Sequence, residues 1–141
     1  MKVSDILKSK GNNVYSVTEE ITVYEALKVM EEKNVGALIV IEGDSLKGII
    51  SERDYARKVI LKGLSSNETA VKEIMTQKVI TVLPEDDIDT CMSLMSGRKI
   101  RHLPVMKDEH ILGIISITDV VTAIIESQKD TISQLESYIS Q

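Results

Sequence analysis

Apolar residues recur every three or four positions in two separate stretches of the chain. This spacing places the apolar side chains on one side of a helix, so each stretch predicts an amphipathic helix packed on a core. The positions are Val23, Ala26, Leu27 and Met30 in the first stretch and Ile88, Cys91, Met92 and Met95 in the second.

Shorter apolar runs surround each helix and predict strands. One strand precedes each helix, two strands joined by a polar turn follow it, and a second helix then begins at a serine. Acidic residues just before each first helix are typical of a helix start. The early strands are expected at 14–17 and 79–82, the helix starts at 18–20 and 83–85, the turns at 42–45 and 107–110, and the second helices from Ser51 and Ser116.

The order strand, helix, strand, strand, helix therefore occurs twice. A shift of 65 positions aligns 17–57 with 82–122 without a gap, and short amphipathic segments at 3–8 and 71–76 precede the two copies. The period is longer than the roughly 20–50 residues of stacking repeats. The sequence therefore predicts an α+β chain in which two tandem units pack as one pseudo-twofold module.

A third segment follows the two copies. The copies are expected at 1–63 and 64–127, and 128–141 is expected to form a C-terminal amphipathic helix. The polar run 127–130 predicts a break between this helix and the repeat. Its apolar stripe either packs on its own chain or forms a dimer contact. The stripe consists of Ile132, Leu135, Tyr138 and Ile139.

Composition and charge narrow the function classes. The 141-residue chain carries 17 basic and 22 acidic residues, and this net charge of −5 without a dense basic run disfavours nucleic-acid binding. No apolar run approaches the roughly 20 residues that span a bilayer, so a cytoplasmic protein without a membrane contact is expected.

A single cysteine excludes an intramolecular disulfide, and with two histidines it excludes a four-ligand zinc site in one chain. The apolar neighbours of Cys91 predict a buried, inert thiol.

Candidate chemistry lies in two matching segments, Gly48–Asp54 and Gly113–Asp119. In each segment an apolar strand ends at a serine, and an aspartate follows three residues later. One interpretation is a capping box, although capping boxes prefer Glu or Gln at the acidic position. The other is a nucleotide site, in which the helix start and the hydroxyl bind phosphate and the carboxylate accepts both hydrogens of a ribose diol. The two interpretations are compatible.

These segments, with Ile100–Val105 and Val71–Thr76, resemble the motifs of tandem CBS domains, the nucleotide-sensing modules named after cystathionine β-synthase. The resemblance covers about residues 1–127, and Ser51–Val59 resembles a group of stand-alone CBS-pair proteins. It implies two adenylate-type sites in the cleft between the copies, with the aspartates on ribose, the hydroxyls and nearby cations on phosphate, and adenine between aliphatic side chains. AMP is the expected ligand, with ATP, ADP or NAD as alternatives.

The two expected sites are not equivalent. The second copy has Arg101 and His102 before a strand where the first copy has small residues, and the first copy has Arg53 where the second has a threonine. Phosphate is therefore expected on Arg53 in one site and on Arg101, assisted by His102, in the other. Each cation has a structural alternative, a surface charge for the arginines and an unligated strand-edge position for the histidine. Pro104 has no N–H for sheet pairing and predicts an irregular backbone open to a ligand. The candidate ligand-binding residues are Val14, Val35, Gly36, Ala37, Ser51, Arg53, Asp54, Thr76, Val79, Ile80, Arg101, His102, Leu103, Pro104, Ser116, Thr118 and Asp119.

The resemblance implies a regulatory module for energy sensing or signal transduction that changes conformation when it binds nucleotide. It implies no reaction, and the sequence shows no strong nucleophile–base pair. A homodimer and an unknown effector protein are the expected partners. The rival interpretation is a protein-interaction scaffold that has kept the CBS fold and lost the ligand, and a nucleotide hydrolase is a more remote third class.

Overall fold

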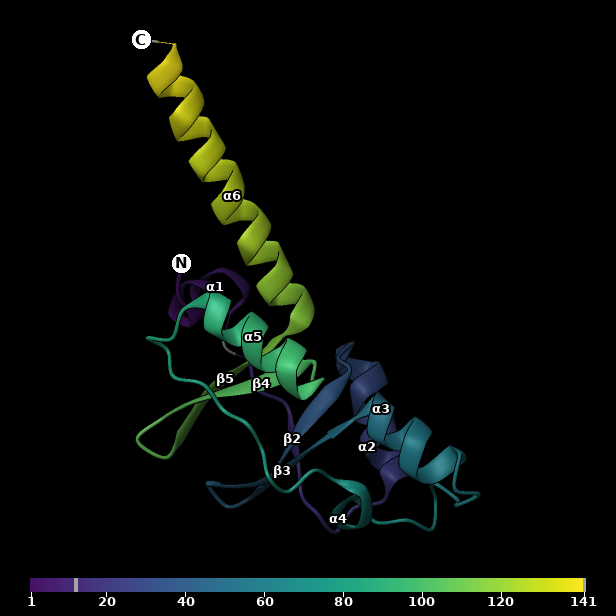
Figure 1. The fold of residues 1–141 in the computed structure, drawn as a ribbon. Helices are drawn as coiled ribbons and strands as arrows, with labels where there is room; N and C mark the ends of the chain where they lie inside the picture. The colour runs from purple at the N-terminus through teal and green to yellow at the C-terminus, as the bar shows by residue number, and fades with distance from the viewer. Residues whose placement is uncertain (12, 141) are drawn as a thin grey trace. The chain divides into compact units, whose positions relative to one another are not determined.

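The computed structural model describes residues 1–11 and 13–140, and the chain forms two compact α+β units (Figure 1). We name them the first-copy unit and the second-copy unit, after the repeat copy that supplies most of each. The first-copy unit contains Asn13–Ile80 and Glu109–Ile111, and the second-copy unit contains Met1–Asn12, Thr81–Asp108 and Leu112–Gln141.

The first-copy unit is built on a three-stranded sheet. Its elements are β1 Ser16–Val17, α2 Val23–Lys33, β2 Ala37–Glu42, β3 Ser45–Ser51, α3 Glu52–Tyr55, a turn of π-helix at Ala56–Ile60, and α4 Val71–Ile74. The strand order is β1-β2-β3, with β1 parallel to β2 and β2 antiparallel to β3. Helix α3 therefore begins where the central hairpin ends, directly after the predicted serine.

The second-copy unit repeats this plan with a two-stranded sheet and a much longer last helix. Its elements are α1 Val3–Lys10, α5 Ile88–Arg98, β4 His102–Lys107, β5 His110–Ser116 from Leu112 onward, and α6 Ile117–Ile139. Strands β4 and β5 are neighbours in the sheet, and Figure 1 shows α6 running away from them. The predicted hairpins and both serine-led helices are confirmed.

Aliphatic side chains fill both cores. The apolar sides of the two predicted helices are confirmed, because Val23, Ala26 and Met30 are buried in α2 and the matching α5 positions are buried too. Cys91 belongs to that buried α5 face and is fully inaccessible. Burial raises the pKa of its thiol to about 11, which confirms an inert cysteine.

The two short helices that precede the copies, α1 and α4, are exchanged between them, since each packs on the opposite copy; we call them the lead-in helices. In the first-copy unit, the N–H groups of Val71 and Lys72 at the start of α4 donate to backbone oxygens of Ile21 and Glu19 at 2.9 and 3.0 Å. In the second-copy unit, α1 uses its first N–H groups in the same way on the loop before α5. Each lead-in thus satisfies its N-terminal donors on the opposite copy. The two compact units therefore differ from the expected copies at 1–63 and 64–127, because residues 1–12 and 64–80 change places and 109–111 join the first-copy unit.

This exchange explains why the predicted helix starts are wrong. Segments 18–20 and 83–85 are loops that receive the lead-in helices, and α2 and α5 begin at Val23 and Ile88. Thr22 caps α2 by accepting a hydrogen bond from the Glu25 N–H at 3.1 Å.

The predicted strand at 79–82 is also wrong. Within the described residues it is reduced to one isolated parallel bridge between Val82 and Val105. A parallel ladder through this bridge needs the next N–H groups from residues 84 and 104, and both residues are prolines. In the first copy the matching donor, the Ile39 N–H, is present and reaches the Tyr15 oxygen at 3.3 Å. The prolines therefore truncate pairing in one copy only.

The predicted break before the C-terminal helix is wrong as well. Helix α6 runs without interruption through 127–130. The polar residues there mark the point at which the helix leaves its own core, because every described residue of α6 after Ser127 is exposed.

Candidate functional site

Both serine–aspartate pairs form capping boxes. At the start of α3 the Ser51 N–H donates to Asp54 Oδ2 at 2.9 Å, and the Asp54 N–H donates to Ser51 Oγ at 3.2 Å. At the start of α6 the same two bonds join Ser116 and Asp119 at 2.8 and 3.1 Å. The capping interpretation therefore holds in both copies, and aspartate is long enough to complete the box.

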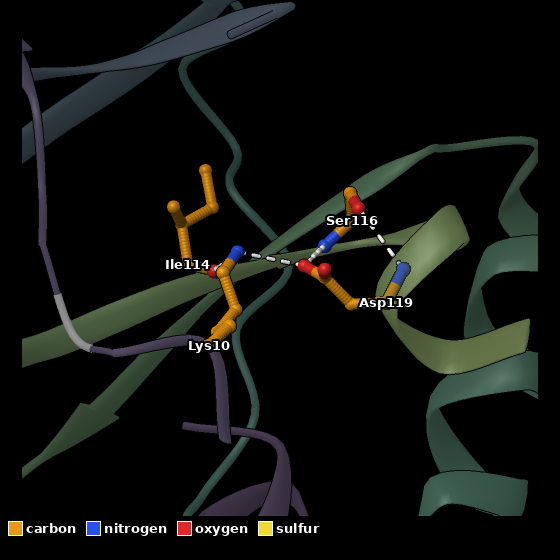
Figure 2. A network of polar contacts seen from close by, with 4 residues as sticks. All are labelled: Lys10, Ile114, Ser116 and Asp119. Carbon is orange, nitrogen blue, oxygen red and sulfur yellow. Dashed lines mark hydrogen bonds and ion pairs between the residues drawn. The ribbon is translucent and has the colours of Figure 1, made fainter. Parts of the chain in front are cut away.

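The Asp54 and Asp119 carboxylates each form an ion pair with a lysine, and the two lysines come from different parts of the chain. In the second-copy unit Lys10 reaches Asp119 Oδ2 at 2.7 Å and the Ile114 carbonyl oxygen at 2.9 Å (Figure 2). In the first-copy unit Lys58 reaches Asp54 Oδ1 at 3.0 Å and a backbone oxygen of α4 at 2.9 Å. Lys58 lies one helical turn after Asp54, whereas Lys10 lies at the end of the lead-in helix α1.

The Lys10 contact controls the ionisation of Asp119. Burial alone would raise the pKa of Asp119, but the hydrogen bonds from Lys10 and from the Ser116 N–H together hold that pKa below its ordinary value. Asp119 is therefore a carboxylate at neutral pH, the state needed to accept hydrogen bonds from a diol.

Replacing Lys10 with methionine should reduce the acid sensitivity of the protein. Because the folded pKa of Asp119 is depressed, its ionisation adds stability above about pH 4, and this contribution is lost as pH falls through the folded pKa. Without Lys10 the pKa rises, so the free energy of unfolding should fall less between about pH 5 and pH 2.5. At pH 7 the variant should lose less than about 1 kcal/mol, because the pair is partly exposed.

Urea unfolding at several pH values measures this change. Lys8→Met is the matched control, since Lys8 is an exposed lysine on the same helix. Identical pH profiles for wild type and Lys10→Met would show that Lys10 does not set the Asp119 pKa.

Backbone pairing brings the first-copy candidates to one edge of the sheet. Ala37 lies opposite Ser51 in the β2–β3 ladder, and the Gly36 oxygen accepts the Glu52 N–H at 3.0 Å. Thr76 pairs with Ile49 through two backbone hydrogen bonds of 3.0 and 2.9 Å. The other candidates of this unit are partly buried: Val14, Val35, Arg53, Val79 and Ile80.

The second-copy candidates divide by exposure. Leu103 and Pro104 are buried in β4, Arg101 and Thr118 are exposed, and His102 is half-buried. The Arg101 oxygen accepts the Ile117 N–H at 2.8 Å, which ties this segment to the start of α6.

The expected irregular backbone at Pro104 is wrong. Pro104 lies inside the regular strand β4, and its oxygen accepts the Val82 N–H at 3.0 Å. The N–H that proline lacks would point to the same side of the strand as this carbonyl, where pairing is limited to a single bridge. The β4–β5 hydrogen bonds lie on the other side of the strand and are unaffected.

His102 is a weaker cation than its residue type suggests. Burial lowers its pKa, and the charge of nearby Lys10 lowers it further, against the opposing effect of Asp119. The imidazole is therefore mostly neutral at pH 7. Positive charge beside Asp119 comes instead from Lys10.

A separate open pocket of about 680 Å³ lies in the first-copy unit. It is lined by Leu27, Met30, Glu31, Asn34, Val35, Gly36, Glu52 and Tyr55. Val35 and Gly36 are candidate residues, but the two glutamates make this pocket unfavourable for phosphate. Within the described residues we find no group of three or more His, Cys, Asp or Glu side chains that could hold a metal ion.

The two lysines were missed at the sequence level. Lys58 could have been found, since it lies four residues after Asp54 and that helical spacing brings charges together. Lys10 had no local signal, because it is separated from Asp119 by 109 positions.

Comparison with known proteins identifies the repeat. The family model of the CBS domain matches residues 3–61 and 71–126. The chain belongs to the CBS-domain family. Its two matched segments are the two copies described above, so the protein is a tandem CBS pair with an additional C-terminal helical segment.

Two relatives cover nearly the whole CBS pair. The mitochondrial CBS domain-containing protein CBSX3 of Arabidopsis thaliana is 44% identical over 146 residues, which cover 97% of this chain and 71% of that protein. A CBS-domain protein from Burkholderia ambifaria MC40-6, assigned to signal transduction, is 48% identical with a TM-score of 0.88 and covers 91% of this chain and 96% of its own.

A third relative was solved with ligands. The CBS domain pair of protein MJ0100, in complex with 5′-methylthioadenosine and S-adenosyl-L-methionine, is 28% identical with a TM-score of 0.78. The match covers 88% of this chain and 99% of that one. No helix among residues 1–11 and 13–140 has the length and apolar character to cross a membrane.

Proposed function

We propose that this CBS pair is a regulatory module that binds an adenine nucleotide, AMP in the first place and ATP, ADP or NAD as alternatives. The observation that carries the proposal is the duplicated helix start, where a serine and an aspartate stand beside a lysine in each unit. Such a start offers N–H groups and positive charge to phosphate and a carboxylate to ribose.

Adenosine chemistry is supported by family membership. MJ0100 binds two ligands that share an adenosine group, and both of its CBS copies are represented in the match to this chain. A ribose diol and an adenine ring are common to those ligands and to AMP. The proposed ligand therefore has the same adenosine group, and its phosphate would lie beside the cations of the present chain.

The two sites would hold phosphate differently. In the second-copy unit the cations are Arg101 and Lys10, with neutral His102 as a hydrogen-bond partner. In the first-copy unit they are Arg53 and Lys58. Because the cations occupy unrelated positions of the repeat, we propose different nucleotide preferences for the two sites.

The regulatory output would pass to another protein. We propose a homodimer of CBS pairs that acts in the cytoplasm on an effector chain, with no reaction catalysed. A scaffold without ligand is the rival function, since the capping boxes alone explain why each serine and aspartate is present.

AMP should raise the melting temperature of the purified protein by several degrees. At about one hundred times its dissociation constant, a ligand stabilises the folded state by roughly 2.7 kcal/mol per site, and for a chain of this size that shifts the midpoint by several degrees. GMP carries the same phosphate with a different base and should shift it less.

Thermal unfolding with AMP, ADP, ATP, NAD and GMP at equal concentrations provides the measurement. Equal shifts from AMP and GMP would contradict the adenine assignment. No shift from any of the five would favour the scaffold, and release of products during incubation would favour the hydrolase.

A further inference from the structure

Helix α6 has two apolar faces, and only one of them is used by its own unit. Val120 and Ala123 are buried, and this inner face ends near Ser127. A second row of residues lies to one side of it and continues to the end of the helix. We call this row the outer stripe; it consists of Val121, Ile125, Gln128, Ile132, Leu135 and Ile139.

The outer stripe is open to solvent along its whole length. Its apolar members are 40–80% exposed, with Val121 at the low end and Ile139 at the high end. Every described residue of α6 after Ser127 is exposed. About three turns of helix therefore project without support, and a helical segment whose apolar side packs on nothing lacks the main source of helix stability in proteins.

The spacing of the stripe indicates the kind of partner. Its members alternate by four and three positions, a period of 3.5 that matches a coiled-coil seam. In heptad terms Ile125, Ile132 and Ile139 take position a, and Leu135 takes position d. The partner is therefore a helix with a matching seam.

Charge next to the seam favours a second copy of the same helix. Lys129 and Glu136 both occupy position e, directly beside the stripe. In an antiparallel pair, e positions face e positions, so Lys129 would lie beside Glu136 of the second copy, and the reciprocal pair would form as well. In a parallel pair they would face position g, which holds Ile124, Thr131 and Tyr138 and offers no charge.

We propose that the outer stripe pairs two chains through an antiparallel contact of their α6 helices. Ile132 then packs against Leu135 of the second copy, and two Lys129–Glu136 pairs flank that centre. This contact specifies the surface for the proposed homodimer, and it does not depend on nucleotide binding.

A charge exchange tests the contact and its direction. Lys129→Glu and Glu136→Lys each convert two attractions into two repulsions and should weaken the self-association driven by α6 about tenfold at low salt. The double variant K129E/E136K restores both pairs and should associate like wild type. Sedimentation of the full chain measures the dissociation constants, with Ser137→Asn on the opposite face as the control.

Disulfide trapping gives an independent readout, because buried Cys91 cannot compete. A mixture of Lys129→Cys and Glu136→Cys chains should form a mixed disulfide under mild oxidation, and neither variant alone should cross-link. Cross-linking of a single variant alone, or none in the mixture, would overturn the proposal. A charge exchange that fails to restore association would also overturn it.

The Leu135→Asn variant separates this proposal from the nucleotide function. It should lose the α6 contact and still bind AMP in calorimetry, because the stripe lies outside both candidate sites. Unchanged association of Leu135→Asn would contradict the contact alone. A chain that shows the mixed disulfide but binds no nucleotide would contradict the nucleotide function alone.

Discussion

Replacing Asp119 with alanine is expected to weaken AMP binding at the second-copy site tenfold or more. Hydrogen bonds to a charged group contribute about 1.5–3 kcal/mol, and roughly 1.4 kcal/mol corresponds to tenfold in affinity. Asp54→Ala should have the same effect on the first-copy site, and the double variant should lose measurable binding. Isothermal calorimetry with AMP measures each affinity.

The capping role of Asp119 makes controls necessary. Asn at this position can still accept the Ser116 N–H, so Asp119→Asn should keep the helix start and lose the charge. Asp86 accepts the Leu83 N–H across the same three-residue spacing at 2.8 Å, away from the candidate site. Asp86→Ala should lose stability while AMP affinity stays unchanged. Unchanged affinity in the double variant Asp54→Ala/Asp119→Ala would leave both aspartates with capping alone.

The sequence was sufficient for features that depend on local pattern or on the repeat. Helical spacing identified the buried sides of α2 and α5, and the repeat matched the two serine–aspartate helix starts before any contact was known. Helical spacing acts over a few residues, and the repeat compares the chain with itself, so a single sequence contains both signals.

Features that depend on distant partners could not be predicted in this way. Segment 18–20 has the acidic residues of a helix start, yet it serves as the acceptor for a lead-in helix some fifty positions later. Lys10 has no neighbour in sequence that points to Asp119. The strand predicted at 79–82 did not form for another reason. Its pairing is limited by Pro84, which follows it, and by Pro104, which lies in the neighbouring strand β4.

Replacing Gly48 with alanine should destabilise the protein clearly more than the matching change in the other copy. A Cβ at Gly48 would lie 2.7 Å from the Thr76 backbone oxygen and 3.0 Å from the Met75 sulfur. The Thr76 oxygen is fixed by its hydrogen bond from the Ile49 N–H, so the backbone cannot give way without losing that bond. Overpacking of this kind costs about 1–3 kcal/mol, which urea unfolding would detect as a lower midpoint.

The repeat supplies the matched comparison at Gly113. There the added Cβ would lie 2.7 Å from the Leu7 Cδ2, the end of a flexible side chain on a lead-in helix. Gly113→Ala should therefore cost less than Gly48→Ala, and the added Leu7→Ala change should cost less in the Gly113→Ala background than in wild type, because it removes the clash. Gly97 in α5 has nothing within 4 Å of an added Cβ, so Gly97→Ala should stabilise the protein by about 0.5–1 kcal/mol. Equal losses of stability in Gly48→Ala and Gly113→Ala would mean that the atoms near the added Cβ move aside equally easily in both copies. The close approach of the Thr76 oxygen would then not be the reason for glycine at position 48.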